Sequence, residues 1–394
     1  MPQLYVASEF LISPIGELRT GIGEPLHDAA VLVRDGQVAA VGPARDFGSG
    51  DLDASGLLVT AGLVDCHTHL VWGGDRSSEF LRRCNGESYQ SIASAGGGIL
   101  STMRATRDCS VSELASGIVS RCELLLSLGT TTVEIKASYG LSPEASWKEL
   151  EAIAIARKLT PIRIIATFMG AHAFPPEYSR DEYLSLLVDK MIPAASGRAE
   201  FCDVFCEVGA FDVTESRIVL EAGIANGLTP KIHADEFNAL GGVQMACELG
   251  AASCDHLLVS GDGEIATLAD SSTVAVVMPS TAFYLDKPYA NARKMLDTGC
   301  TVALGSDFNP GSSQVPSMAF AMGLGVSKMQ MSPIETLMGA THHSSRALRR
   351  DGGRIEVGKD ADLCIWPAKN LDHLVYQFAF IRPNHVMLGG EIVV

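Results

Sequence analysis

Histidines and one aspartate recur just after short apolar runs in this chain of 394 residues. His67 and His69 follow the first such run, and residues two apart on a strand point to the same side. His233, His256 and Asp307 each end a later run of the same kind. This mixture of imidazole and carboxylate ligands suits Zn²⁺ or Fe²⁺/Fe³⁺, whereas Mg²⁺ and Ca²⁺ prefer oxygen alone. The pattern therefore predicts a transition-metal site.

A metal ion at such a site would activate water for attack on a substrate. Metal binding lowers the pKa of water from 15.7 to about 7, and a neighbouring base must then accept a proton. Glu236 and His256 are the two candidates, and Asp307 could serve as ligand and proton acceptor together. The competing interpretations are a carboxylate at a helix N-terminus for Glu236 and a core histidine for His256. The sequence leaves the choice of general base open.

The position of lysine bears on the number of metal ions. Many hydrolases with two ions bridge them through a modified lysine at the end of a strand. The third and fourth strand-like runs end without lysine, at residues 168–172 and 206–209, and Lys136 follows the second run. We therefore expect a single ion.

Strand-like apolar runs alternate with amphipathic helical stretches, which is typical of parallel βαβ units. The predicted strands cover residues 62–67, 131–135, 162–167, 202–206, 229–233, 253–256, 273–278 and 301–306. Predicted helices include residues 111–127, 144–158 and 214–225. Eight such units fit an α/β fold of the (β/α)₈ barrel type, whose functional groups lie at the carboxyl ends of the strands. A doubly wound sheet is the alternative, because periodicity alone does not exclude it.

The two ends of the chain have the composition of β-strands. Segments 30–34 and 37–41 flank Asp35-Gly36, which predicts a tight hairpin. Segments 361–366 and 386–394 also look like strands. Because chain ends often lie close together, we expect the two regions to pair into one small β domain. The predicted organisation is a β domain from residues 1–60 and 351–394 around a barrel of residues 61–350.

Composition narrows the class of protein. Apolar residues make up 47% and charged residues 19%, which is enough for a large core. The net charge of −16 disfavours nucleic acid as a partner, and an anionic substrate would need a local cation. No apolar stretch reaches the roughly 18–20 residues of a membrane helix, and no secretory signal is expected at the N-terminus. The ten cysteines, including Cys202 and Cys206 as core thiols, are therefore expected to be reduced in a cytosol.

Several motifs resemble the amidohydrolase superfamily, and together they span nearly the whole chain. The opening motif is GLVDCHTH at residues 62–69. Other motifs resemble the branch that hydrolyses an imidazolone ring in histidine degradation: GGDRSSEF at 73–80, GGGI at 96–99, EIKASYGL at 134–141, GAH at 170–172, HADE at 233–236 and SDFNPGS at 306–312. One departure is Ala137-Ser138, where we expect glycine shortly before the tyrosine in family members.

The resemblance implies a reaction and a set of site residues. In this branch, water adds to the ring carbonyl carbon of 4-imidazolone-5-propanoate, the ring C–N bond breaks, and N-formimidoyl-L-glutamate forms. By similarity, one Zn or Fe ion would be held by His67, His69, His233 and Asp307. The residues that match substrate-contacting positions are Arg76, Tyr139, His172, Glu236, Asn309, Gly311 and Ser312. The likeness also implies a homodimer.

The chemistry of these side chains is consistent with such a substrate. Arg76 could bind the propanoate through two parallel hydrogen bonds. Tyr139 offers a hydroxyl group, His172 could polarise the ring oxygen, and the turn at 309–312 could present backbone N–H groups to a carboxylate. Without the resemblance they would be a surface arginine, a strand-end aromatic, a loop histidine and an ordinary turn. The glycines at 96–98 lack a following Lys-Ser/Thr and predict a loop beside the site rather than a phosphate loop.

Two other functions compete with ring opening. The first is a deaminase of the same superfamily acting on a cyclic amidine or an aminopurine, since His233, Glu236, His256 and Asp307 would serve that reaction nearly as well. Arg76 favours a carboxylate-bearing substrate instead, and release of ammonia would discriminate the two. The second is a non-catalytic barrel scaffold, which would be expected to lose metal ligands.

Overall fold

The computed structural model describes residues 9–21, 23–87, 91 and 96–394. Within these residues the larger sheet has eight strands in the order β12-β11-β10-β9-β8-β7-β6-β5, each parallel to its neighbours. Their bounds are β5 (Leu63–Asp65), β6 (Thr130–Ala137), β7 (Arg163–Ala171), β8 (Phe201–Cys206), β9 (Thr229–Ala234), β10 (Ser253–His256), β11 (Val274–Val277) and β12 (Val302–Leu304). All eight predicted strands are confirmed.

The ends of this sheet meet and close the barrel. A parallel bridge joins Thr68, beyond β5, to Phe308, beyond β12. The backbone N–H of His69 donates to the carbonyl of Phe308 at 3.0 Å, and that of Asp307 donates to the carbonyl of His67 at 3.0 Å. The chemistry-bearing segments after the first and last strands are thereby held side by side.

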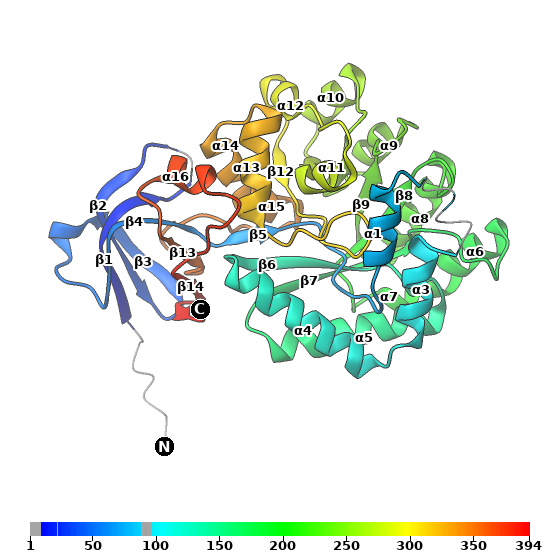
Figure 1. Ribbon diagram of the computed structural model, residues 1–394, viewed down its shortest axis with the longest axis horizontal. Helices are drawn as coiled ribbons and strands as arrows, with labels where there is room; N and C mark the ends of the chain where they lie inside the picture. Colours follow the sequence, from blue (N-terminus) through cyan, green and yellow to red (C-terminus); the bar gives the residue numbers. More distant parts are fainter. Residues whose placement is uncertain (1–8, 22, 88–90, 92–95) are drawn as a thin grey trace.

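Helices lie around the barrel (Figure 1). Their bounds are α1 (Ser77–Cys84), α3 (Ile99–Asp108), α4 (Val111–Ser127), α5 (Pro143–Leu159), α6 (Arg180–Leu186), α7 (Ile192–Ala195), α8 (Val213–Ala225), α9 (Gly242–Glu248), α10 (Asp262–Ala269), α11 (Pro279–Leu285), α12 (Ala292–Thr298), α13 (Met318–Met329), α14 (Pro333–Gly339), α15 (His342–Ala347) and α16 (Leu371–Tyr376). The predicted helices match α4, α5 and α8 to within one residue at each end. α5 begins with the Ser142 side chain accepting the N–H of Ala145 and with Pro143 in its first turn.

The second sheet combines strands from both ends of the chain, as predicted. Its order is β15-β14-β13-β4-β1-β2-β3. The bounds are β1 (Glu9–Arg19), β2 (Leu26–Arg34), β3 (Gln37–Pro43), β4 (Leu52–Ala61), β13 (Leu363–Trp366), β14 (His385–Leu388) and β15 (Glu391–Ile392). It lies at the left of Figure 1, beside the barrel. The domain limits at residues 60 and 350 stay a prediction, and residues 1–8 are outside the described part of the chain.

Local chemistry explains the hairpin and the connection to the barrel. Asp35 and Gly36 have φ values of 51° and 80°, which suit the two central positions of a tight hairpin turn. The indole N–H of buried Trp366 in β13 donates to the Thr60 hydroxyl in β4 at 2.9 Å. Since β4 leads almost directly into β5, this contact anchors the first barrel strand to the terminal sheet.

The cysteines and the helix lengths bear on two expectations from composition. All ten cysteines are free thiols, and Cys202 and Cys206 are buried in β8. Among the described residues, no helix combines the length and hydropathy needed to cross a bilayer.

Candidate active site

The predicted site residues lie at one end of the barrel. His67 and His69 follow β5, Tyr139 follows β6 and His172 follows β7. His233 lies in β9, Glu236 follows it, His256 ends β10, and Asp307 follows β12. All of them are buried except the partly exposed His172. The side chains at the carboxyl ends of the parallel strands therefore converge on one enclosed space, as is typical of the barrel architecture.

Four polar atoms of the predicted metal ligands lie close together. His69 Nε2 is 3.4 Å from His233 Nε2, and Asp307 Oδ1 is 3.6 Å from both His67 Nε2 and His69 Nε2. Ligand atoms around a tetrahedral ion with bonds of about 2.1 Å are separated by roughly 3.4 Å. The donor types and these three separations are compatible with a single transition-metal ion, held by His67, His69 and Asp307 and joined by His233 through its contact with His69.

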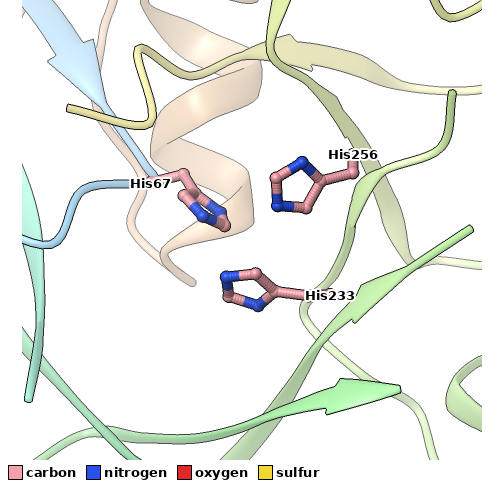
Figure 2. A group of neighbouring side chains, drawn as sticks. All are labelled: His67, His233 and His256. Atoms are coloured by element: carbon pink, nitrogen blue, oxygen red, sulfur yellow. The ribbon is translucent and has the colours of Figure 1, made fainter. Parts of the chain in front are cut away.

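His256 completes the ring of imidazoles. Figure 2 shows His67, His233 and His256 turned toward one another, with His67 on the segment that follows β5. The ring centroid of His67 lies 4.4 Å from that of His233 and 5.3 Å from that of His256. Ligand atoms of these three histidines lie within 4.8 Å of one another, as do those of His67, His69 and Asp307. The cluster thus contains every predicted ligand and one base candidate.

A second layer of side chains holds each candidate ligand through its other polar atom. His67 Nδ1 donates to Asp255 Oδ2 at 2.6 Å, and His233 Nδ1 donates to Asp203 Oδ1 at 3.1 Å. Asp307 Oδ2 accepts the Thr281 hydroxyl at 2.8 Å. These contacts commit Nδ1 as the protonated ring nitrogen and leave Nε2 with its lone pair. Accordingly, His67 Nε2 is buried and has no hydrogen-bond partner among the described residues.

Burial also keeps the imidazoles in the form that binds metal. The pKa of His67 and that of His69 lie well below the ordinary value, first because burial disfavours the charged ring and then because neighbouring cationic groups repel it. Neutral histidines are the ligands that transition metals need.

The departure from the family motif has a structural role. Ala137-Ser138 stand where glycine was expected shortly before Tyr139, and the Ser138 hydroxyl forms a 2.8 Å hydrogen bond with Nδ1 of His69. The backbone N–H groups of Tyr139 and Gly140 donate to the buried carboxylate of Glu149 at 2.9 Å each. The loop is therefore held from both sides, and Tyr139 stays in place.

Glu236 and His256 face each other at the edge of the cluster. Glu236 Oε2 lies 3.7 Å from His256 Nε2. Burial raises the pKa of Glu236 well above its ordinary value, and the negative charges of Asp307 and Glu207 add to the effect. His256 Nδ1 is buried without a hydrogen-bond partner among the described residues. The geometry brings both base candidates to the same place.

His172 is held in an orientation that was not expected. Its Nδ1 donates to the carbonyl of Ser138 at 3.0 Å, and its ring stacks on His69 with centroids 5.2 Å apart. Burial lowers the pKa of His172 to about 3, so the ring is neutral at working pH. Nε2 therefore presents a lone pair and accepts hydrogen bonds. In this tautomer Nε2 does not donate to a ring oxygen, and the substrate contact of His172 stays a prediction.

The turn after β12 is organised from within. Asn309 Oδ1 accepts the backbone N–H groups of Gly311 and Ser312 at 2.8 Å each. Its Nδ2 donates to the carbonyl of Asp307 at 2.6 Å. The expectation that this turn offers those N–H groups to a carboxylate is therefore wrong in this conformation. Asn309 instead fixes the backbone that carries Asp307.

Arg76 lies against the same turn. A Cβ atom added at Gly311 would come within 2.1 Å of Arg76 Nη1, so only glycine leaves room for the guanidinium. Arg76 Nε donates to Glu79 Oε2 at 2.9 Å, and Glu79 also accepts the N–H of Gly98, at the start of α3. The loop glycines at 96–98 thus border the site through this contact.

A second arginine on the same turn was missed. Arg83 Nη1 donates to the carbonyl of Gly311 at 3.3 Å, and its guanidinium lies over the ring of Tyr284. Its Nη2 is buried without a hydrogen-bond partner among the described residues. Arg76 directly precedes α1 and Arg83 lies seven residues later, about two helical turns along, so this spacing could have suggested that both side chains lie on one side.

Charged residues inside barrel strands were also missed. Lys136 lies within β6 rather than after it, because the strand runs two residues further than predicted. Burial disfavours its charge, yet its pKa lies above the ordinary value because Asp203, Glu134 and Asp255 surround the ammonium group. A charged residue inside an otherwise apolar strand was the available signal.

Strained backbone concentrates at these strand ends. Asp235, His256, Leu257 and Asp307 have φ values of 54°, 81°, 59° and 52°. Non-glycine residues in this region cost roughly 1–3 kcal/mol each and persist where the surrounding structure holds them. His256 and Asp307 are predicted site residues, Leu257 follows His256, and Asp235 precedes Glu236, so left-handed backbone lies within or directly beside the candidate site.

Comparison with known proteins agrees with this architecture. The profile of the amidohydrolase family matches residues 142–393. An imidazolonepropionase from Symbiobacterium thermophilum is 43% identical, over 98% of this chain and 97% of that protein. Among solved structures, a triazine hydrolase variant has a TM-score of 0.76 at 17% identity, covering 98% of this chain and 94% of its own. An adenosine deaminase from Xanthomonas campestris with bound zinc has a TM-score of 0.71 at 18% identity, covering 97% and 92%. The structural likenesses show the shared fold.

Proposed function

The chain belongs to the amidohydrolase family and, within it, to the imidazolonepropionases, and we propose that its buried histidine cluster is the site at which the imidazolone ring is hydrolysed. The protein hydrolyses 4-imidazolone-5-propanoate to N-formimidoyl-L-glutamate in histidine degradation. One observation supports this most strongly: the convergence of His67, His69, His233 and Asp307 at ligand spacing, beside the facing pair Glu236 and His256.

The proposed metal site consists of His67, His69, His233 and Asp307. A bound zinc or iron ion would supply a Lewis acid and lower the pKa of water to about 7. The chain's own contribution is to keep the histidines neutral and their Nε2 atoms free, through Nδ1 contacts such as His67 to Asp255.

Proton transfer is assigned to Glu236, with His256 facing it. Water adds to the ring carbonyl carbon, and the proton it loses must reach the ring nitrogen as the C–N bond breaks. Glu236 is buried beside His256, and a carboxylate at this place can accept the proton and then deliver it. His256 lies 3.7 Å away and orients the carboxyl group.

Substrate recognition is assigned to the residues beside His69 and the turn after β12. Arg76 binds the propanoate, and Tyr139 contacts it through its hydroxyl. Nε2 of His172 accepts a ring N–H, because its Nδ1 is already committed to Ser138. Asn309, Gly311 and Ser312 form the turn against which the guanidinium is packed.

Replacing Arg76 with alanine is expected to raise KM for the propanoate substrate about 10- to 150-fold. A charge-assisted hydrogen bond is worth roughly 1.5–3 kcal/mol, and ring chemistry does not depend on this group directly. Steady-state kinetics check it, with kcat expected to change little. The matched control is Arg82→Ala on α1, the helix that begins directly after Arg76; the partner of Arg82 is Glu87. An unchanged KM in Arg76→Ala would move the carboxylate contact elsewhere.

Replacing Gly311 with alanine is expected to raise KM in the same direction. The added Cβ would lie 2.1 Å from Arg76 Nη1 and must displace the guanidinium. Gly263→Ala is the control, because no heavy atom lies within 4 Å of its new Cβ. In a double variant with Arg76→Ala, the two effects should not multiply, since both act on one contact. Multiplying effects would contradict the proposed packing.

The central test is direct. Metal-loaded protein is incubated with freshly prepared imidazolonepropanoate, and the loss of ring absorbance is followed together with ammonia release. Ring opening predicts that the absorbance is lost and that no ammonia is released. The deaminase alternative predicts that ammonia is released when the protein is incubated with an aminopurine or a cyclic amidine instead. Stoichiometric zinc or iron in the purified protein would argue against a non-catalytic scaffold, which need not hold metal.

The finer properties belong to the same proposal. The metal is one zinc or iron ion per subunit, the protein forms a homodimer, and it works in the cytosol. Free thiols at all ten cysteines are consistent with a reducing compartment. Elemental analysis and sedimentation velocity test the first two, and fractionation of cells tests the third.

A further inference from the structure

Beneath the candidate metal ligands lies a closed group of five charged side chains without exposed surface. Lys136 Nζ lies 2.6 Å from Asp203 Oδ2, 2.9 Å from Glu134 Oε2 and 3.7 Å from Asp255 Oδ2. Lys231 Nζ lies 3.3 Å from Glu134 Oε1 and 3.9 Å from Asp255 Oδ2. All five side chains are 0% exposed. Neither sequence motifs nor the proposed reaction accounts for this group.

Two of these carboxylates are also the partners of candidate ligands. Asp203 accepts from Nδ1 of His233, and Asp255 accepts from Nδ1 of His67. Each carboxylate therefore stands between a histidine and the Lys136 ammonium. The chain of contacts runs from Lys136 through two carboxylates to two Nε2 atoms that face the metal position.

Buried carboxylates need a cation to stay charged and in place. Ligand atoms of Asp203, His233 and Asp255 lie within 4.8 Å of one another, a spacing that could itself hold a cation. The ammonium of Lys136 is the cation that lies beside both carboxylates. Burying such charges without a partner is costly, and removing one partner leaves the other uncompensated.

We propose that Lys136 is a positioning residue for the metal site. Its ammonium holds Asp203 and Asp255 in the orientation in which they accept Nδ1–H from His233 and His67, and this leaves both Nε2 atoms free for the ion. The inference rests on the proposed metal site and adds to it a group that touches neither metal nor substrate.

Metal affinity of the full-length apoprotein tests the proposal. Lys136→Met keeps the side-chain length and removes the charge, and Zn²⁺ affinity is measured by competition with a chromophoric chelator. The expected result is binding weaker by about 10- to 100-fold, the usual effect of losing an outer-shell partner. Lys148→Met is the control, because within the described part of the chain Lys148 Nζ donates to the carbonyls of Arg107 and Cys109, outside the site. Its affinity should equal that of the wild type.

A double-mutant cycle separates positioning from general loss of structure. Asp203→Asn keeps the shape of the side chain that lies between Lys136 and His233. The double variant with Lys136→Met removes one charge of each sign. If Lys136 acts through Asp203, the double variant binds Zn²⁺ no more weakly than the weaker single variant. If Lys136→Met does not fold, comparison of the charge-balanced double variant with Asp203→Asn makes the same test.

Three results would overturn the inference: wild-type affinity in Lys136→Met, effects of the two changes that multiply, or, where Lys136→Met does not fold, a double variant at least tenfold weaker than Asp203→Asn. These results are distinct from failure of the proposed function. A wild-type protein that binds Zn²⁺ tightly but does not open the imidazolone ring refutes the reaction and leaves the positioning role intact. A wild-type protein that turns over substrate while Lys136→Met binds normally refutes only the positioning role.

Discussion

Asp307→Ala is expected to abolish turnover and to deplete the protein of metal. The carboxylate contributes Oδ1 at 3.6 Å from Nε2 of both His67 and His69, and its other oxygen accepts from Thr281. Alanine therefore removes the only carboxylate of the predicted ligand set. We expect kcat to fall by at least about 10³-fold, since a ligand and a proton acceptor are lost together. Steady-state kinetics and elemental analysis of the same preparation check both effects.

The control for this change is Asp297→Ala, an exposed aspartate on α12 that pairs with Arg293. It should retain metal and full activity. Asp307→Asn keeps the size of the side chain and a carbonyl oxygen, so a severe loss there would point to the charge rather than to packing. Full activity with normal metal content in Asp307→Ala would refute the proposed site.

Glu236→Gln is expected to lower kcat by about 10²- to 10⁴-fold while metal content stays unchanged. Glutamine has the shape of the carboxyl group but does not exchange a proton, and that range is typical for loss of a general acid or base. KM should change far less than kcat, because the group acts during bond making and breaking. Steady-state kinetics on metal-loaded protein measure the split.

His256→Gln and Glu248→Gln complete the comparison. Glu248 lies exposed on α9, where it pairs with Arg217, and its replacement should leave both constants unchanged. His256→Gln should cost less than Glu236→Gln if the histidine only orients the carboxyl group. A larger loss in His256→Gln, with metal retained, would transfer the proton-carrying role to His256.

Much of the candidate site can be predicted from local patterns in the amino-acid sequence. His67 and His69 share a side because residues two apart on a strand do so, and the later site residues follow apolar runs that became β9, β10 and β12. The hairpin at Asp35-Gly36 depends only on the φ values those two residues favour. Such features need no knowledge of distant contacts, and they proved correct.

Other features depended on which strands lie side by side and in what register. The barrel brings β6, β8, β9 and β10 together. This arrangement places Ser138 against His69 and Asp203 against His233, and it places Lys136 among three carboxylates. The tertiary structure also decides which nitrogen of His172 carries the proton, because Nδ1 donates to the carbonyl of Ser138. It likewise decides that the backbone N–H of Gly311 is already bonded to Asn309.

The amino-acid sequence by itself determined the strands and helices, the terminal hairpin, and the residues available to hold a metal ion. Periodicity, turn preferences and ligand chemistry depend on a few neighbouring residues, so they can be recognised in a single sequence. Only the tertiary structure decided which atom of each side chain is free. That choice depends on hydrogen-bond partners up to 188 positions apart, as for His67 and Asp255, and closure of the barrel alone brings such partners together.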